Sequence, residues 1–406
     1  MRIIHTSDWH LGQYFFTKSR AAEHQHFLNW LIEQVTLHQV SAVIVAGDIF
    51  DTGSPPSYAR ELYNKFIVDL QKTGCQLVIL SGNHDSVSVL NESSSLLTYL
   101  NTNVITSGVE PNVITLTDKQ KQPNGLVCAI PFLRPRDIQL SVAGQSIEEK
   151  QLSLQTAIHN YYQASYQLAV EQRNALGLDI PIIATGHLTV IGAALTDSVR
   201  DIYIGTLDAF PSGAFPPADY IALGHIHRPQ IIGGQHHIRY CGSPIALSFD
   251  EAQQPKSVCL VEFNGSALTE VTPLTIPISQ PLQSIKGSLQ EIQQQLEVCR
   301  DYQGEKPVWL DIEVASQDYL ADIQQRIETL TETLPVEVVL LRRARKQRQG
   351  KLDVLPNESL NELTAEEVFL RRLAEESLDD TDREQRLKQL FKQSFDALRS
   401  EQEGQA

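Results

Sequence analysis

The sequence predicts an α/β protein, and three observations carry that prediction. The first 190 residues alternate short β-branched runs with amphipathic stretches, which is typical of βαβ units and a largely parallel central sheet. Five of the runs end in clusters of His, Asp and Asn, at the strand ends where open α/β sheets bind ligands. Beyond a proline-rich break near residue 276, a second strand–helix pattern predicts a further, smaller α/β unit.

Strands are expected where β-branched and other apolar residues form short runs. The segments between several of these runs carry apolar residues at helical spacing, so helices should connect the strands. From 230 to 276 the pattern becomes short runs separated by Gly and Pro, which predicts antiparallel strands that close a second sheet or layer. The expected strands cover 2–8, 42–48, 76–83, 126–132, 180–187 and 219–225, and the expected helices cover 20–39, 58–72 and 147–172.

The domain organisation is predicted from breaks in composition. Three prolines within 273–281 indicate a boundary, so we expect a large α/β domain over 1–275 and a small α/β domain over 276–342. Charged residues then become more frequent, which predicts a charged linker over 343–360. A helical segment is expected over 361–400, since two Thr-x-x-Glu capping boxes begin amphipathic stretches there.

Composition and charge exclude several classes of protein. The net charge of −16 rules out a protein that holds nucleic acid by bulk positive charge. No apolar run approaches the ~18 residues of a membrane span, and the first ten residues lack the apolar stretch of a signal peptide. The five cysteines are widely spaced and form no CxxC, which is typical of reduced core residues. We therefore expect a cytoplasmic protein with no membrane association.

The polar clusters at five expected strand ends together indicate a metal site. Two adjacent divalent ions need a bridging carboxylate with oxygen and imidazole ligands around it. Each cluster alone is more often ordinary turn chemistry, whereas five at successive strand ends are hard to obtain by chance. The lack of a thiolate favours Mn²⁺, with Fe²⁺ and Zn²⁺ also chemically possible. The clusters are Asp8-Trp9-His10, Gly47-Asp48, Gly82-Asn83-His84-Asp85, Gly186-His187 and Gly224-His225-Ile226-His227.

The set DxH, GD, GNHD, GH and GHxH resembles the signature of the calcineurin-like metallophosphoesterases. Longer stretches, among them HTSDWHLGQ, VAGDIFDTGSPPSYAR, LSGNHDS and ALGHIHRPQ, are similar to the SbcD family of bacterial nuclease subunits. That family is related to the meiotic-recombination nucleases that act on double-strand breaks. The resemblance runs over nearly the whole chain. It implies two packed β-sheets flanked by helices, a small α/β capping domain that faces DNA, and a C-terminal helical arm.

The resemblance also implies a role for each residue of the clusters. His84 would contact the scissile phosphate or protonate the leaving oxygen instead of binding metal. Recombination nucleases often have a His three residues after the bridging carboxylate, where this chain has Asp51. Asp51 would orient His84 by accepting its second N–H. The implied ligands are Asp8, His10, Asp48 and His227 for one ion, and Asp48, Asn83, His187 and His225 for the other, with Asp48 bridging.

A function and partners follow from the same resemblance. It implies a manganese-dependent hydrolase that cleaves DNA phosphodiester bonds in repair, recombination and replication. Its action would be exonucleolytic on duplex ends and endonucleolytic on hairpins and single strands. The C-terminal helices would bind an SbcC-type coiled-coil ATPase, with a homodimer of this chain inside a heterotetramer.

A basic run that follows the small α/β unit is the candidate DNA contact. Six basic side chains in ten residues without an acid suit a phosphate backbone, and a solvated linker is an equally good interpretation. The main alternative function, a small-molecule phosphodiesterase or phosphoprotein phosphatase, predicts no such segment. A scaffold with an inactive metal site would need a missing ligand. The run consists of Arg342, Arg343, Arg345, Lys346, Arg348 and Lys351.

Overall fold

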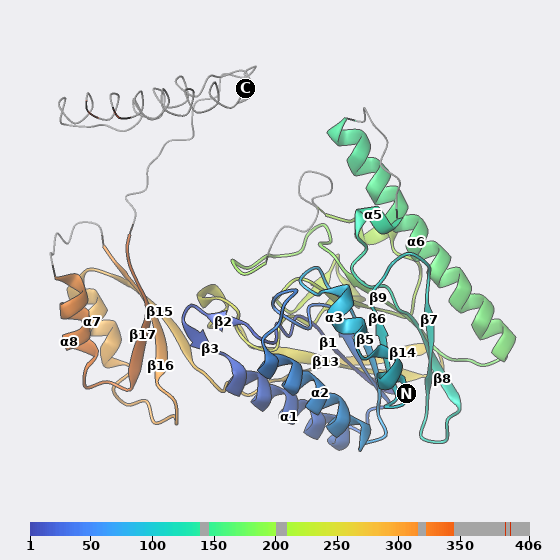
Figure 1. Cartoon of the computed structure of the whole chain (residues 1–406), viewed down its shortest axis with the longest axis horizontal. Helices are drawn as coiled ribbons and strands as arrows, with labels where there is room; N and C mark the ends of the chain where they lie inside the picture. The colour runs from blue at the N-terminus through green and yellow to red at the C-terminus, as the bar shows by residue number, and fades with distance from the viewer. Residues whose placement is uncertain (139–145, 200–208, 316–321, 345–385, 387–389, 391–406) are drawn as a thin grey trace, which may run out of the picture. The chain divides into compact units, whose positions relative to one another are not determined.

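The computed structural model describes residues 1–138, 146–199, 209–315, 322–344, 386 and 390 (Figure 1). Residues Met1–Arg343 form one compact unit, and Ala344–Ala406 form a second. The predicted linker and helical segment therefore lie almost entirely outside the described residues. Within the described part of the chain, no helix is long and apolar enough to cross a membrane.

Two six-stranded sheets form the larger part of the first unit. In the first sheet, in the order β14-β13-β1-β4-β5-β6, the four strands from β1 to β6 run parallel, and β13 and β14 extend the sheet antiparallel. Strands β4 and β5 are fully buried, which is why their sequences are uninterrupted apolar runs. The bounds are β1 Arg2–Thr6, β4 Ala42–Ala46, β5 Gln76–Leu80, β6 Thr102–Ile105, β13 Ser257–Asn264 and β14 Ala267–Thr275.

The second sheet has the order β11-β12-β10-β9-β8-β7. Its central strands β12, β10, β9 and β8 are parallel, and the two edge strands pair antiparallel. The prediction for 230–276 is thus only partly right. Strands β11 and β12 join the second sheet, whereas β13 pairs with β1 inside the first sheet. This position agrees with the sequence of β13, which is apolar and buried over most of its length. The bounds are β7 Val113–Thr117, β8 Pro123–Cys128, β9 Ile182–His187, β10 Tyr220–Gly224, β11 Gln230–Ile232 and β12 Gln235–Tyr240.

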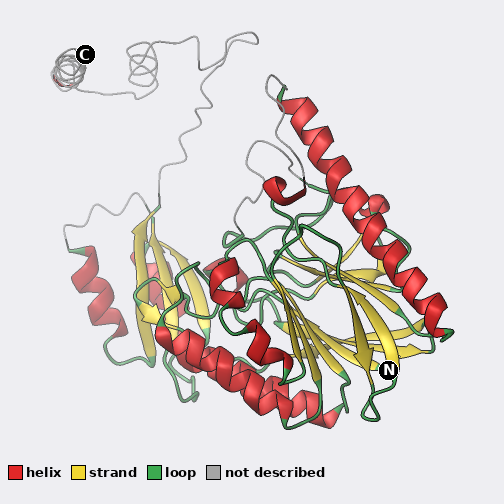
Figure 2. Ribbon diagram, turned by 45° about the vertical axis from the view of Figure 1, so that its right-hand side comes forward, coloured by secondary structure: helices red, strands yellow, loops and turns green. Residues whose placement is uncertain are grey.

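Helices cover the outer faces of both sheets (Figures 1 and 2). The 30-residue helix α6 begins at a capping box, in which Ser146 and Glu149 exchange side-chain-to-backbone hydrogen bonds. It ends at Gly177, whose φ of 63° is the left-handed conformation that glycine adopts without strain. The helix bounds are α1 Ala21–Leu37, α2 Ser57–Gln71, α3 Val87–Asn91, α4 Ser94–Thr98, α5 Pro135–Ile138 and α6 Ile147–Leu176, with short 3₁₀ turns at Ser212–Ala214 and Phe249–Glu251 (η2).

Three apolar cores hold these layers together. The central core lies between the sheets and includes Ile44 and Val78 from the first sheet and Val127 and Ile183 from the second. A second core packs the first sheet against α1 and α2, and a third packs the second sheet against α6. The prediction of two packed sheets flanked by helices is confirmed. This sandwich brings the carboxyl ends of parallel strands from both sheets to the same end of the molecule.

A separate three-stranded parallel sheet, in the order β15-β16-β17, follows the proline-rich segment. Its own core includes Ile285, Leu310 and Ile312, which pack against the two helices. On its other face, the Trp309 ring stacks on Phe15 at 5.9 Å. The domain boundary at 275 and 276 stays a prediction. The bounds are β15 Leu282–Gly287, α7 Leu289–Glu297, β16 Val308–Val314, α8 Ile323–Thr331 and β17 Val336–Arg343, and a small hairpin of β2 Tyr14–Phe15 and β3 Lys18–Ser19 lies in the first 20 residues.

Candidate metal centre

The loops that follow β1, β4, β5, β9 and β10 converge, as their sequence clusters predict. Hydrogen bonds tie the first two loops together, since the amide of Asp8 donates to the carbonyl of Gly47 and the amide of His10 donates to that of Asp48. Several side chains of the clusters lie within 4.8 Å of one another in three overlapping groups. The groups are Asp8, His10 and His227; His10, Asp48 and His84; and Asp48, His187 and His225.

Asp48 lies at the junction of two of the groups and is buried. Its Oδ2 atom is 3.6 Å from Nε2 of His10 and 3.2 Å from Nε2 of His187. Its other oxygen, Oδ1, accepts a hydrogen bond of 2.9 Å from the amide of His84. One carboxylate oxygen thus faces imidazoles from both sheets, while the other oxygen is held by the backbone.

Hydrogen bonds also fix the predicted ligands that lie around Asp48 in space. Oδ1 of Asp8 accepts from the amide of His225 at 2.8 Å, which links the loops after β1 and β10 across the two sheets. Nε2 of His187 lies 2.9 Å from Oδ1 of Asn83. The predicted ligands therefore form a single cluster built from both sheets, and all of them are buried except Asn83, which is partly buried.

Burial and the charges of neighbouring groups shift the pKa values of the residues in this cluster. Burial lowers the pKa of His187, but the nearby Asp48 carboxylate outweighs burial and raises that pKa to about 9. Burial raises the pKa of Asp48, but His187 and His10 hold it well below its usual range. Burial, followed by the charge of His187, lowers the pKa of His225 well below its ordinary value. A cationic centre therefore suits this site, with His225 in the neutral form that binds metal.

Asp51 contacts two histidines. Its carboxylate Oδ1 lies 3.2 Å from Nδ1 of His10, and its backbone carbonyl accepts from Nδ1 of His84 at 2.7 Å. The expected contact, in which Asp51 accepts an N–H of His84, is thus made by the backbone carbonyl. The role of the Asp51 side chain stays a prediction.

Asp85 is a buried carboxylate of this region to which sequence reasoning assigned no role. It accepts hydrogen bonds from the amides of Ile49, Phe50 and Gly82, and so joins the loops after β4 and β5. Burial and then the charge of Asp48 raise its pKa to about 6. Its position in the GNHD motif was the available signal, because an Asp after a turn commonly accepts backbone amides.

Comparison with known families agrees with this geometry. Residues 1–229, more than half of the chain, match the family of calcineurin-like phosphoesterases. Residues 279–377 match a family described as the Type 5 capsule protein repressor C-terminal domain.

Three curated relatives are each named as the SbcD component of the nuclease SbcCD. The protein of Escherichia coli strain K12 is 57% identical over 404 residues, which cover 99% of this chain and 100% of the relative. That of Rhodobacter capsulatus is 30% identical, covering 91% of this chain and 93% of its own. That of Bacillus subtilis strain 168 is 31% identical, covering 79% and 81%. The chain belongs to the SbcD nuclease family.

Membership of the SbcD family confirms the predicted fold class and the predicted class of enzyme, a metal-dependent nuclease with a calcineurin-like phosphoesterase domain. The nuclease prediction is supported over the alternative of a small-molecule phosphodiesterase or a phosphoprotein phosphatase.

The residues of this SbcD chain fit the divalent ions that the phosphoesterase family implies. Nε2 of His10 and Nε2 of His225 are buried and have no hydrogen-bond partner within the described part of the chain. Each of these histidines lies in a close group with at least one of the carboxylates of Asp8 and Asp48. A buried imidazole nitrogen that has no hydrogen-bond partner among the described residues is suited to bind a metal ion. His84 belongs to one of the close groups too, so proximity alone does not separate it from the ligands.

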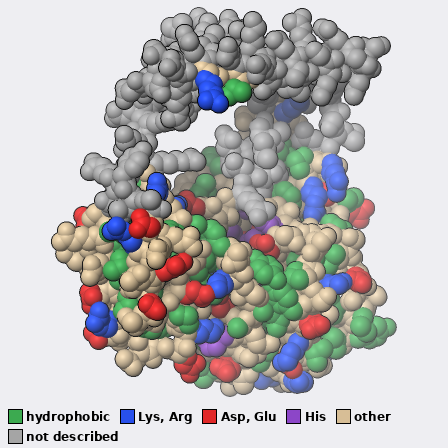
Figure 3. Space-filling model, turned by 60° about the vertical axis from the view of Figure 1, so that its left-hand side comes forward, with side chains coloured by type: hydrophobic (Ala, Val, Ile, Leu, Met, Phe, Trp, Pro, Cys, Tyr) green, Lys and Arg blue, Asp and Glu red, His purple; other side chains and the backbone are tan. Residues whose placement is uncertain are grey.

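Two basic residues of the candidate DNA contact are described, and both lie in β17. The guanidinium of Arg342 binds the buried carboxylate of Asp311, with Nε to Oδ1 at 3.1 Å and Nη2 to Oδ2 at 2.5 Å. Figure 3 shows Lys and Arg side chains scattered among acidic ones over the described part of one face. The remaining residues of the run, Arg345, Lys346, Arg348 and Lys351, lie outside the described residues.

Proposed function

We propose that this chain hydrolyses DNA phosphodiester bonds with two divalent metal ions, which we propose to be Mn²⁺. The observation that carries the proposal is the single oxygen of Asp48 that faces His10 and His187 at 3.6 and 3.2 Å. An oxygen between two imidazole groups is suited to bridge ions ~3.5–4 Å apart. We assign Asp8, His10, Asp48 and His227 to one ion, and Asp48, Asn83, His187 and His225 to the other.

The bound ions would supply Lewis acidity and would neutralise negative charge at the scissile phosphate. The chain's own residues would orient the ligand rings and protonate the leaving group. Because a carbonyl oxygen only accepts, the contact with Asp51 requires Nδ1 of His84 to carry a proton. Nε2 of His84 is then the atom that would donate a proton to the departing sugar oxygen. The carboxylate of Asp51 would position His10 by accepting from its Nδ1.

The proposed substrates are duplex ends, hairpins and single strands of DNA. We further propose that residues 361–400 bind an SbcC-type ATPase, and that the chain forms a homodimer within a heterotetramer. Leu96 and Tyr99, in and just after α4, are 63% and 87% exposed, and such apolar side chains are suited to an interface between copies. All five cysteines are buried free thiols, which is consistent with the proposed cytoplasmic location.

A direct test compares hairpin DNA with bis(p-nitrophenyl) phosphate as substrates of the purified chain. Each would be incubated with Mn²⁺ and with Mg²⁺, and the DNA products would be separated on a denaturing gel. We expect hairpin opening with Mn²⁺. Hydrolysis of the dye without cleavage of any DNA would contradict the proposed substrate.

A further inference from the structure

A network of buried and partly buried polar groups lies around Nδ1 of His227. Nδ1 of His227 lies 2.5 Å from the hydroxyl of Ser198, and this hydroxyl donates to Oε1 of Glu251. Nδ1 is itself 3.6 Å from the same carboxylate oxygen. Glu251, in η2, is fully buried, so its carboxylate cannot exchange these contacts for water.

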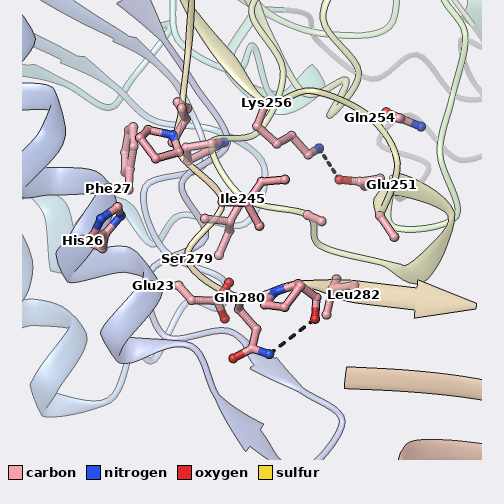
Figure 4. Close-up of a pocket in the computed structure, with 17 residues that line it drawn as sticks. Glu23, His26, Phe27, Ile245, Glu251, Gln254, Lys256, Ser279, Gln280 and Leu282 are labelled. Carbon is pink, nitrogen blue, oxygen red and sulfur yellow. Dashed lines mark hydrogen bonds and ion pairs between the residues drawn. The ribbon is translucent and has the colours of Figure 1, made fainter. Parts of the chain in front are cut away.

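The surroundings of Glu251 fix its carboxylate in place. Oε2 accepts from Nζ of Lys256 at 2.5 Å, from the amide of Leu247 at 3.1 Å and from the hydroxyl of Ser243 at 3.3 Å. Lys256 also donates to the backbone carbonyl of His227 at 3.2 Å. Figure 4 shows the Glu251–Lys256 pair in the wall of a pocket. The same buried pair therefore anchors both the backbone of His227 and the hydroxyl that meets its ring.

The hydrogen bond between the hydroxyl of Ser198 and the ring of His227 can have only one direction. It gives its proton to Glu251, because a carboxylate only accepts, and so it presents a lone pair to Nδ1 of His227. Nδ1 must then carry the proton, and Nε2 carries the lone pair that a metal ion needs. The imidazole of His187 is held similarly, with its Nδ1 donating to the carbonyl of Ala46 at 2.9 Å.

We propose that Ser198, oriented by Glu251, is a positioning residue that fixes the ring and the tautomer of His227 for binding one of the two ions. This inference rests on the proposed function, in which His227 is a ligand. Two further hydrogen bonds hold the segment that carries Ser198 in place. Thr196 donates to Glu251 at 3.0 Å, and the amide of Asp197 donates to Oδ2 of Asp250 at 3.1 Å.

The test measures Mn²⁺ binding by electron paramagnetic resonance, in which free Mn²⁺ gives a signal that bound ions lose. We expect Ser198→Ala to weaken the binding of one ion by roughly 10- to 100-fold and to leave the other unchanged. Ser198→Thr keeps a hydroxyl and should restore the affinity. Ser248→Ala is the matched control, because Ser248 donates to the same oxygen of Glu251, at 3.2 Å, from outside the contact between Ser198 and His227.

A double-mutant cycle tests the order of the contacts. If Glu251 acts on the ring through Ser198, Glu251→Gln should weaken the same ion on its own, and the loss in the double variant should be smaller than the sum of the two single losses, because only the anchoring of the His227 backbone through Lys256 is then left to lose. Additive losses would overturn that arrangement. Wild-type affinity for both ions in Ser198→Ala would overturn the inference and leave the proposed function intact. A wild-type chain that bound no Mn²⁺ would overturn both.

Discussion

Four of the proposed ligands have a backbone conformation that side-chain-bearing residues rarely adopt. The φ angles of Asp8, His10, Asp48 and His225 are 54°, 48°, 51° and 95°. Such conformations cost on the order of 1 to 3 kcal/mol each and persist only where the surrounding structure holds them. Here the hydrogen bonds between the loops after β1 and β4 do so for the first three.

Asp48→Asn is expected to abolish nuclease activity in a folded protein. The substitution keeps the shape of the side chain but removes the charge that serves both ions, a loss of about 4 kcal/mol or roughly 10³-fold in kcat. Cleavage of hairpin DNA measures the loss, and circular dichroism checks the fold. Activity within tenfold of wild type would exclude a bridging role.

His84→Gln is expected to spare metal binding and to lower kcat by roughly 10²- to 10⁴-fold, the usual contribution of a general acid. Metal content by mass spectrometry and an anomalous-scattering map provide the measurement. Loss of an ion in this variant would show that His84 is a ligand and that its role has been misassigned.

At the scale of elements, β17 includes the first residues of the basic run and places one of them in an ion pair within the small sheet. Arg342 lies in the strand and binds Asp311 of β16, which is buried, while half of the Arg342 side chain is exposed. Among the described residues, the guanidinium is the side-chain partner of this buried carboxylate. The first residue of the basic run therefore has a structural task besides any contact with DNA.

Arg342→Gln should destabilise the small sheet by about 1–3 kcal/mol, because it leaves the carboxylate of Asp311 without its charged partner. Thermal unfolding measures the effect. The double substitution Arg342→Gln with Asp311→Asn is the control, and it should recover part of the loss. An unchanged midpoint in the single variant would show that the pair contributes nothing.

The DNA contact is tested without disturbing that pair. Arg343→Gln combined with Arg345→Gln should weaken DNA binding and lower the slope of log K against log salt by about one unit for each lost phosphate contact. Fluorescence anisotropy at several salt concentrations gives the slope. If the slope does not change, the run is a solvated linker.

For the whole molecule, the metal centre belongs to the compact unit of Met1–Arg343, and the proposed docking segment belongs to the other unit. Truncation after Gly350 is therefore expected to leave a folded phosphoesterase that binds Mn²⁺ but no longer co-purifies with an SbcC-type ATPase. Pull-down of the ATPase is the measurement, with the full-length chain as control. Complex formation at full affinity would show that the C-terminal segment is not the docking element.

Metal removal should also lower the stability of the whole unit, since the ions bind the folded state and compensate buried negative charge. Mn²⁺ at about 100 times its Kd should add roughly 2.7 kcal/mol per site. Differential scanning calorimetry with and without EDTA measures the difference. Equal melting temperatures would contradict a site that forms only in the folded chain.

The parts of this protein that are local in the chain could be predicted from its sequence. Strands β4, β5 and β16 begin where their apolar runs begin, and α2 lies within one residue of the expected range. The clusters at strand ends could be recognised too, because parallel strands bring their carboxyl ends to one edge. Pattern and propensity act over a few residues, so a single sequence suffices for them.

Contacts between distant segments needed the tertiary structure. The pairing of β13 with β1 joins residues 254 to 260 positions apart, and nothing in either run specifies the other as its neighbour. The carboxylate of Asp51 lies against His10 while its backbone carbonyl accepts from His84, and the sequence could not assign the two groups of one residue to two different rings. Neither the segment around Ser198 nor the one around Glu251 identifies His227 as its neighbour. Ser198 follows β9, His227 follows β10 and Glu251 lies in η2 after β12, so the pairing of these strands in one sheet brings the three residues together.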